Sequence, residues 1–453
     1  MTNKLSVKSL FVCIILTMML VMGLTACNID TQPGGNAVEP KSEQKNEVQP
    51  VSIKFFSHFP DRSTGLGKLE QLMIDNYMKK NKNVTIEVEA LQDEPYKQKF
   101  KAYLASDNMP DICMVHGQPA FLEPVMKEGY LAELDPSDYE DYGFLPGSLD
   151  GFSYDDKLYA LPRSTDVMLI YYNKNIFKQY GVKVPETFND LVEAAKAFIE
   201  NEMIPLAMDG RDKWPLAIFY QDVAQRVNGN RKLIYDAINR DTTFAEEESF
   251  LEAAEYVNEL VDNQLFQKGF IVSDYAATAN LFTQEKAAMY YMGSWEMGIA
   301  SNPDLSESFR ENIGVITLPV IEGGKGKVTD LIASNNTGYA VSEKSKVKGE
   351  VIELLNYIFE PENWAKNAWQ MGVAIPGQVY DEFLTGNETQ VQKEVTKILS
   401  EATSISGTLW YDSGSPSLKS SGEILSQELA AGIKTPEEFI KGLDAAADKE
   451  KGK

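Results

Sequence analysis

The stretch at 158–198 reads LYALPRSTDVMLIYYNKNIFKQYGVKVPETFNDLVEAAKAF, and the order of its elements decides the fold. A polar step, RSTD at 163–166, precedes an apolar run at 167–172 that is typical of a buried strand. A short helix that stops at Gly181 should follow, and a second helix should open near 188 with Thr187 or Asn189 as its N-cap. This order predicts a hinge between two lobes and one wall of a ligand cleft.

The first residues carry the pattern of an export signal. Lys4 and Lys8 precede an apolar core at 10–24, and the sequence LTAC ends at Cys27 with small residues before the cysteine. The core is short for a membrane span, and its end matches a lipoprotein cleavage site, so residues 1–27 are predicted to be a lipoprotein signal peptide. The Cys27 thiol would then carry diacylglycerol and tether the protein to the extracellular face of the cell membrane, as in Gram-positive bacteria. An ordinary cleaved signal with a chance cysteine is the alternative.

Composition limits what the rest of the chain can be. Residues 28–50 contain almost no large apolar side chain and should form a flexible linker. The roughly 400 residues that follow are too many for one ordinary core and suit two lobes. The net charge of -24 excludes a typical nucleic-acid binder, because the chain would repel phosphates. Only Cys27 and Cys113 would remain after cleavage, so no disulfide framework is expected.

The first part of the body alternates strands and helices. Strands are expected at 51–56, 84–90 and 111–115, with helices at 65–80 and 96–105 between them, which predicts a mostly parallel sheet. Ligands bind beyond the carboxyl ends of such strands, so the loops at 57–63 and 116–119 become candidates. Both histidines of the chain, His58 and His116, fall in these loops. No HxxxH or Cys/His spacing accompanies them, so we expect neither a metal nor another cofactor. Contact with a polar ligand and a plain loop position both stay open.

Four separated stretches carry a family resemblance. They are LYALP with LIYYNKNIF at 158–177, FTQEKAAMYYMGSW at 282–295, YAVS at 339–342 with the helices at 348–363, and the ending LAAGIKTPEEF at 429–439. Together they resemble bacterial extracellular solute-binding proteins of the family-1, maltose-binding-like type, although Glu285 replaces the usual glycine. The resemblance implies an α/β fold of the two-lobed periplasmic-binding-protein type (type II). Each lobe would be a mixed, mostly parallel sheet flanked by helices, with the ligand cleft between the lobes.

The resemblance also implies a division of the chain. Lobe one would comprise 51–163 and 331–376, and lobe two 164–330 and 377–453. The chain would cross between them at 161–166, near 319–330 and near 375–378. A monomer is expected to capture a carbohydrate, most simply an oligosaccharide, and to deliver it to the permease subunits of an ABC importer.

Sugar recognition needs flat aromatic rings and groups that pair with hydroxyls. Trp295 and the Trp410–Tyr411 pair match aromatic positions of the family's cleft, and Asp166 matches an acidic residue of the crossing. Trp214, Trp364 and Trp369 lie within predicted helices and are expected to serve packing. The complete set of predicted ligand-binding residues is Trp295, Asp166, Trp410, Tyr411, Asp412, His58, Asp61, Arg62, His116, Gln118 and Arg163.

Two other functions compete with this hypothesis. A charged small solute, such as a phosphate ester or a polyamine, could occupy the same fold, but only Arg62 and Arg163 are well placed for a phosphate. A surface glycoside hydrolase would also use carboxylates and tryptophans. The chain shows no eightfold strand–helix repeat and no G-x-S-x-G or H-E-x-x-H motif, so an enzyme is not expected.

Overall fold

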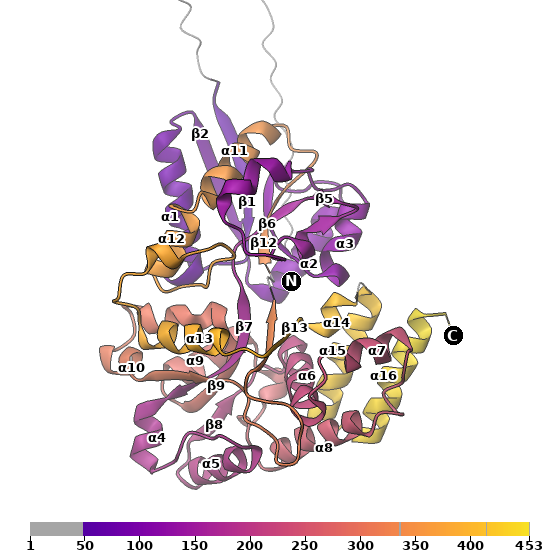
Figure 1. Cartoon of the computed structure of the whole chain (residues 1–453). Helices are drawn as coiled ribbons and strands as arrows, with labels where there is room; N and C mark the ends of the chain where they lie inside the picture. Colours follow the sequence, from indigo (N-terminus) through magenta and orange to yellow (C-terminus); the bar gives the residue numbers. More distant parts are fainter. Residues whose placement is uncertain (1–48, 335–336, 414, 453) are drawn as a thin grey trace, which may run out of the picture. The chain divides into compact units, whose positions relative to one another are not determined.

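The structure is a computed structural model that describes residues 49–334, 337–413 and 415–452. Its strands form one five-stranded sheet, one six-stranded sheet and a small hairpin of β4 (Ser153–Tyr154) with β5 (Lys157–Leu158). Each large sheet has helices on its faces and its own hydrophobic core (Figure 1). The expectation of two α/β lobes is therefore confirmed, and we call the halves built on the five-stranded and six-stranded sheets the first and second lobe.

The first sheet has the strand order β2-β1-β3-β12-β6. β1 pairs in parallel with both β2 and β3, whereas β12 runs antiparallel to β3 and to β6. The carboxyl ends of β1, β3 and β6 and the amino end of β12 therefore share one edge. The strands are β1 (Val51–Ser57), β2 (Val84–Ala90), β3 (Ile112–His116), β6 (Ala160–Pro162) and β12 (Thr337–Val341).

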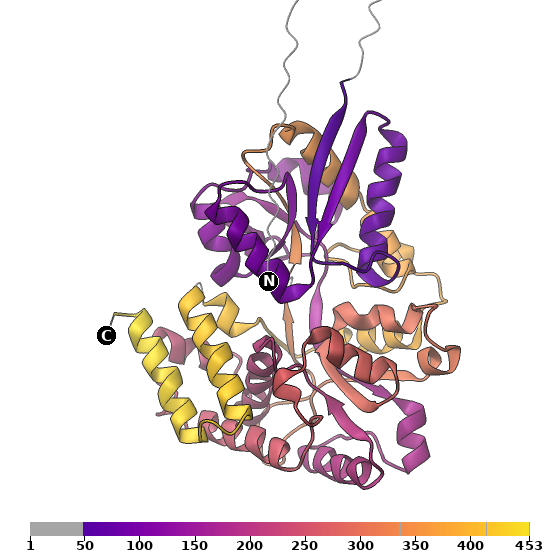
Figure 2. The same cartoon turned by 180° about the vertical axis from the view of Figure 1, so that it is seen from behind.

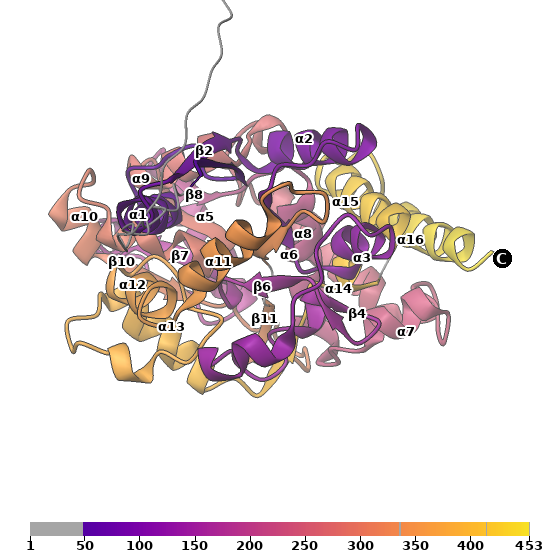
Figure 3. The same ribbon diagram turned by 90° about the horizontal axis from the view of Figure 1, so that it is seen from above.

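Helices cover both faces of this sheet (Figure 3). On one face α1 (Gly65–Lys80) packs against α11 (Lys348–Phe359), with the Tyr77 and Tyr357 rings 5.3 Å apart. On the other face α2 (Asp93–Ala105) lies beside α3 (Pro119–Lys127), where Phe100 stacks on Phe121 at 5.2 Å. The βαβαβ pattern predicted from the sequence is confirmed, and α1 and β2 have the predicted bounds.

The second sheet is built around β7 (Asp166–Asn173), whose eight residues are all buried. β7 pairs antiparallel with three strands: β11 at its start, β9 along its middle and β10 at its end. β8 and β13 extend the sheet by parallel pairing with β9 and β11. The apolar run at 167–172 is thus the central strand of a lobe. The partner strands are β8 (Ile204–Ala207), β9 (Ala287–Gly293), β10 (Ile313–Ile316), β11 (Asp330–Ser334) and β13 (Ser404–Ser406).

The second lobe holds most of the helices. α15 and α16 pack side by side, and α16 also packs against α8 (Figure 2). Tyr220 of α6 meets Phe439 of α16 edge to face at 4.7 Å, which joins this group to the core. The helices are α4 (Lys174–Tyr180), α5 (Phe188–Glu200), α6 (Trp214–Asn228), α7 (Leu233–Asn239), α8 (Glu248–Asp262), α9 (Tyr275–Thr283), α10 (Glu307–Glu311), α13 (Gln390–Ser400), α14 (Leu409–Asp412), α15 (Pro416–Ala430) and α16 (Pro436–Glu450).

Local signals explain the helices that follow β7. Asn173 caps α4 by accepting from the backbone N–H of Asn175 and Ile176, and Gly181 ends the helix in the left-handed region, at φ 66°. Thr187, not Asn189, caps α5. Its hydroxyl accepts from the Asp190 N–H, and the Asp190 carboxylate accepts from the Thr187 N–H, so that the pair forms a capping box.

The chain passes between the lobes at places that differ in part from the prediction. β6 ends at Pro162 and β7 begins at Asp166, so residues 163–165 make the first passage within the predicted segment. β11 still belongs to the second sheet and ends at Ser334, whereas β12 begins at Thr337 in the first sheet. The return to the first lobe therefore comes after 334 and not within 319–330.

The third passage runs beside the first. Ser164 forms an antiparallel bridge with Pro376, and the Thr165 N–H donates to the Ile375 carbonyl at 2.9 Å. α12 (Trp364–Gln370) precedes this segment, and its Trp364 belongs to the first core while its Trp369 belongs to the second. The two neighbouring passages thus form a short ladder between the lobes.

The signal peptide, Cys27 and most of the linker lie outside the described residues. Cys113 is free and buried in β3. Among the described helices, none is long and apolar enough to cross a membrane.

One buried arginine ties α6 to the segment that follows β10. The Nε and Nη1 atoms of Arg226 donate to the carbonyls of Leu318 and Asp330 at 2.9 and 2.8 Å, and Nη2 lies 3.5 Å from Asp222. Only 1% of the Arg226 side chain is exposed. Its removal would leave the buried Asp222 carboxylate without its ion-pair partner and two carbonyls without their donor.

We predict that Arg226→Met lowers the free energy of unfolding by about 3–5 kcal/mol, because it breaks a buried ion pair. The control is Arg211→Met, since Arg211 forms an ion pair with Asp274 in which the side chains are 63% and 40% exposed. That change should cost less than about 1 kcal/mol. Urea unfolding of both variants measures the difference, and equal losses would contradict the assignment.

Candidate functional site

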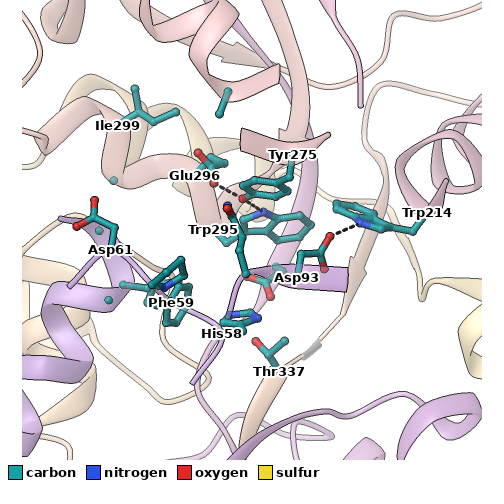
Figure 4. A pocket seen from close by; sticks show the side chains of 18 of the residues that line it. His58, Phe59, Asp61, Asp93, Trp214, Tyr275, Trp295, Glu296, Ile299 and Thr337 are labelled. Atoms are coloured by element: carbon teal, nitrogen blue, oxygen red, sulfur yellow. Dashed lines mark hydrogen bonds between the residues drawn. The ribbon is translucent and has the colours of Figure 1, made fainter. Parts of the chain in front are cut away.

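A cavity of about 490 Å³ lies between the two lobes. Residues of both lobes line it, including the ends of β1, β3 and β6 and the start of α6. Trp295 is the side chain that connects the two sides, because it packs against the hydrophobic cores of both lobes. Figure 4 shows its ring among the labelled lining residues.

Trp295 owes its position to a glycine. It follows β9 at the start of a 3-10 helix, η4 (Ser294–Ser301). A Cβ atom on Gly293 would lie 2.0 Å from the Trp295 ring, so only glycine lets the indole fold back over the end of the strand. The GSW sequence at 293–295 is therefore a device that places a flat ring at the wall of the cavity.

A hydrogen-bond chain fixes the ring. The Trp295 Nε1–H donates to the Tyr275 hydroxyl at 3.0 Å, and that hydroxyl donates to the Glu296 carboxylate (Figure 4). Burial raises the pKa of Glu296, while the hydrogen bond from Tyr275 lowers it. Ring and carboxylate therefore sit side by side, which offers both stacking and hydrogen bonding to a ligand.

A second tryptophan joins the lobes directly. The Nε1–H of Trp214 in α6 donates to Asp93 in α2 at 2.8 Å, and the Trp214 ring lies 5.9 Å from that of Trp295 (Figure 4). Lys97 compensates the Asp93 charge at 2.9 Å. Asp93 and Lys213, the residue before Trp214, have φ of 34° and 68°, which is unfavourable for residues other than glycine. Two of the non-glycine residues with positive φ in the described chain thus lie where the lobes meet.

The first passage and the start of β7 each contribute one charged residue. Asp166 is 4% exposed and Arg163 is 2% exposed, and both line the cavity. Burial raises the pKa of Asp166 to about 6, although Arg163 and a hydrogen bond from Ser164 act in the opposite direction. Arg163 also lies against Phe59, with its Cζ atom 4.6 Å from the ring centroid. Both residues, which the sequence predicts as ligand contacts, lie at the cavity, and their contact with a ligand stays a prediction.

The two histidines face the same cavity. Their rings are 6.3 Å apart, and the Nε2 atom of each has no hydrogen-bond partner in the described part of the chain. Burial, followed by Arg163, His116 and Lys97, lowers the pKa of His58, and burial followed by Lys97, Arg163 and Lys419 lowers that of His116. Both imidazoles are therefore neutral at pH 7.

The remaining predicted ligand contacts of the first lobe fall into two groups, those that line the cavity and those that do not. Asp61 and Gln118 line the cavity. Asp61 is also held by the hydroxyls of Ser63 and Thr64, and Gln118 donates to the Thr408 hydroxyl at 3.4 Å. Arg62 is not among the lining residues. Its guanidinium instead pairs with the buried carboxylate of Glu70, so the structure does not bring Arg62 to the cavity.

Only part of the predicted ligand-binding set in the tail segment reaches the cavity. Tyr411 lines the cavity, and its hydroxyl donates to Glu423 at 2.8 Å. Trp410 is fully buried, where it stacks on Phe244 at 5.8 Å and donates to the Ala217 carbonyl at 3.4 Å. Asp412 accepts from Tyr235 at 3.0 Å and is not among the lining residues. The short helix α14 turns Trp410 into the core, so Trp410 and Asp412 are not brought to the site.

Several lining residues were missed in the sequence. Trp214 was assigned to helix packing, and Asp93, Tyr275 and Glu296 were not singled out. Glu296 had one usable signal, since it directly follows Trp295 in the loop after a strand. Asp93 and Trp214 become partners only when the two lobes meet, which no local pattern reveals.

A metal centre has no candidate in the described ranges. No group of three or more His, Cys, Asp or Glu side chains there is arranged to hold an ion.

The family model for the bacterial extracellular solute-binding protein matches residues 62–363. A relative from Streptococcus mutans, the "Multiple sugar-binding protein", is 23% identical over 342 residues, which cover 74% of each chain. The "Lipoprotein LipO" of Bacillus subtilis is 24% identical over 296 residues, covering 60% of this chain and 57% of that protein.

A solved structure gives the same picture. It comes from work on xylan utilization by the thermophilic bacterium Caldanaerobius polysaccharolyticus, with a TM-score of 0.79 and 27% identity. The likeness covers 87% of this chain and 99% of that chain. The predicted resemblance and the type II fold are confirmed: the chain belongs to the bacterial extracellular solute-binding protein family.

Proposed function

We propose that the protein captures a carbohydrate, most simply an oligosaccharide, in the cavity between its lobes. The observation that carries the proposal is the Trp295–Tyr275–Glu296 group at the cavity wall. An indole face covers the apolar face of a pyranose, and a neighbouring carboxylate accepts hydrogen bonds from its hydroxyls. A lining that combines two tryptophans with several carboxylates suits a sugar better than an apolar solute.

The cavity size agrees with this class. A volume of about 490 Å³ falls within the range of roughly 300–1,000 Å³ that is usual for small-molecule sites. The name of the Streptococcus mutans relative and the xylan context of the solved structure support a sugar ligand.

The two lobes would close over the sugar about the passages at 163–165 and 375–378. We assign the elements from β1 through β6, together with β12 and α11, to lobe one. Lobe two comprises the elements from β7 through β11 and those from α13 through α16. The Asp93–Trp214 hydrogen bond would form as the lobes meet. The closed, loaded protein would then dock as a monomer on the permease subunits of an ABC importer, and it would release the sugar unchanged instead of acting as an enzyme.

A neutral sugar panel tests this function. Isothermal titration calorimetry with xylose, cellobiose, maltose, galactose and their linear tri- and tetrasaccharides should detect binding of at least one sugar. The same sugar should raise the melting temperature of the protein in a thermal melt. Chromatography of the same mixtures after long incubation should return every sugar intact. Shortened products would favour a glycoside hydrolase, and no binding across the panel would argue against a neutral oligosaccharide receptor.

We also propose that Cys27 anchors the protein by a lipid at the extracellular face of the membrane. The lipobox at 24–27 supports this, as does the lipoprotein name of the Bacillus subtilis relative. Cys27→Ser should leave the exported protein unlipidated, because serine cannot form the thioether. In cells that express the variant, the protein should lose metabolic labelling by palmitate and leave the membrane fraction. Unchanged labelling would contradict the assignment of Cys27.

Trp295→Ala should weaken binding of the best sugar in the panel by at least about 30-fold, which is typical of losing a central aromatic contact of about 2 kcal/mol. Trp295→Phe should keep part of the affinity, because a smaller ring still stacks. Trp369→Phe is the control, since Trp369 packs on Tyr380 within the core and is not among the lining residues. Calorimetric affinity decides, and equal affinities of the alanine variant and the parent would sink the stacking role.

Asp166→Asn should stabilise the unliganded protein at pH 7 and weaken sugar binding. The pKa of Asp166 rises from its ordinary value of 3.8 to about 6 in the folded state. The folded state therefore holds the proton more tightly, and this carboxyl lowers stability progressively as the pH rises from about 4 to 6. The full effect at pH 7 is at most roughly 3 kcal/mol.

Melting temperatures between pH 4 and 7 measure this effect, and the variant should have the flatter profile. Asp190→Asn is the control with the opposite sign, because capping hydrogen bonds lower the pKa of Asp190. That variant should be less stable than the parent at pH 7. A less stable Asp166→Asn protein at pH 7 would show that the buried charge is compensated.

A further inference from the structure

Four side chains with unpartnered polar atoms meet at one edge of the first sheet. They are the Nε2 atoms of His58 and His116, the Nε and Nη1 atoms of Arg163, and the Oγ1 atom of Thr337. All four side chains line the cavity. We call these four residues the donor cluster, and Figure 4 shows His58 and Thr337 within it.

The topology of the sheet explains why they meet. His58 follows β1, His116 ends β3 and Arg163 follows β6, and these three strands have their carboxyl ends at the same edge. β12 runs the opposite way, so its first residue, Thr337, lies at that edge too and is the register partner of His116. The cluster is therefore held by strand pairing instead of by a flexible loop.

Cations act on the two histidines of the cluster although the whole chain carries -24. The charged groups that act on the two histidines are Arg163, Lys97 and Lys419, all of them cations. Lys97 already pairs with Asp93 and Glu94, and Lys419 with Glu423. Within the described ranges, no carboxylate forms an ion pair with Arg163 at 4.0 Å or less.

Buried polar atoms without partners are costly, and a buried unpaired cation is more costly still. Asp166 acts on Arg163 without an ion pair at 4.0 Å or less. With a pKa of about 6 it is largely ionised at pH 7, so it compensates the guanidinium in part and leaves the unpartnered Nε and Nη1 atoms of Arg163 without an acceptor. Neutral hydroxyls of a sugar would satisfy the imidazoles and Thr337, but they would not compensate a guanidinium. A single carboxylate provides one negative charge and several acceptor sites, which matches one unpaired cation with donors around it. A phosphate dianion would call for a second free cation.

We propose that the donor cluster binds a carboxylate of the captured sugar, so that the ligand is an acidic oligosaccharide containing a uronic acid residue. This inference rests on the proposed carbohydrate function and assigns the two ends of the cavity different tasks. A neutral ring stacks on Trp295 beside Glu296, and the uronate faces Arg163, His58, His116 and Thr337.

Matched pairs of sugars test the inference. The pairs are digalacturonic acid against galactobiose, and glucuronic acid-substituted xylotriose against xylotriose, with glucose 6-phosphate as a second anion. Calorimetry on the full mature chain at pH 7 should show the acidic member of at least one pair binding at least tenfold more tightly than its neutral partner. Glucose 6-phosphate should bind more weakly than that acidic sugar.

Two variants locate the preference. Thr337→Val removes an unpartnered hydroxyl without changing the side-chain shape, and Arg163→Met removes the charge but keeps an apolar stem against Phe59. Both should move the acidic-to-neutral affinity ratio toward one. Thr337→Val should not lower the melting temperature, so a loss of preference there cannot come from misfolding. Thr85→Val, on an exposed position of β2, should leave the ratio unchanged.

Specific outcomes would overturn the inference. Neutral members that bind as tightly as acidic ones would overturn it while leaving the carbohydrate function intact. A preference that survives in both Thr337→Val and Arg163→Met would move the acidic contact elsewhere, and tightest binding of glucose 6-phosphate would replace the carboxylate by a phosphate. If none of the four sugars binds, the inference fails, and the neutral panel decides separately whether the carbohydrate function fails with it.

Discussion

The missing side chain at Gly293 is the constraint on which the site depends. Because a Cβ there would lie 2.0 Å from the Trp295 ring, the indole can lie over the strand end and contact the cores of both lobes. Tyr275 and Glu296 then hold the ring through a chain of hydrogen bonds. The wall of the cavity is thus rigid at the point where a ligand would stack, and rigidity there limits the entropy lost on binding.

The range of an interaction along the chain separates the features that the sequence predicts from those that it does not. The strands and helices at 51–90 and 166–200 follow from apolar periodicity, caps and turn residues, all of which act within a few residues of the chain. The Thr187–Asp190 capping box is such a local device. The loops after β1 and β3 become site candidates because parallel strands bring their carboxyl ends to one edge. Local chemistry and sheet topology together therefore suffice to place His58 and His116, whereas Arg163 is predicted from the polar step that crosses between the lobes.

Contacts between the lobes obey no such rule. Asp93 and Trp214 are partners at 2.8 Å although 121 positions separate them in the chain. Trp410 is predicted as a ligand contact from the family resemblance, yet α14 turns its ring onto Phe244. The return to the first lobe was expected in the glycine-rich segment at 319–330, but Arg226 binds the carbonyls of Leu318 and Asp330 and holds that segment to the second lobe. In each case a long-range partner overrides the local pattern.

Strained backbone, unpartnered polar atoms and the stacking surface occupy different places around the cavity. The backbone strain at Asp93 and Lys213 lies at the contact between them, where closure would determine whether it is relieved or maintained. The donor cluster lies at the edge of the first sheet, and the stacking surface lies on the second lobe. Since buried donors without acceptors lower stability, a ligand that supplies acceptors favours the closed state over the open one by its differential contacts. A solute that only stacked on Trp295 would contact one wall and leave the other unsatisfied. Closure would then depend on recognising the ring and its polar groups together, which makes specificity a property of the closed state.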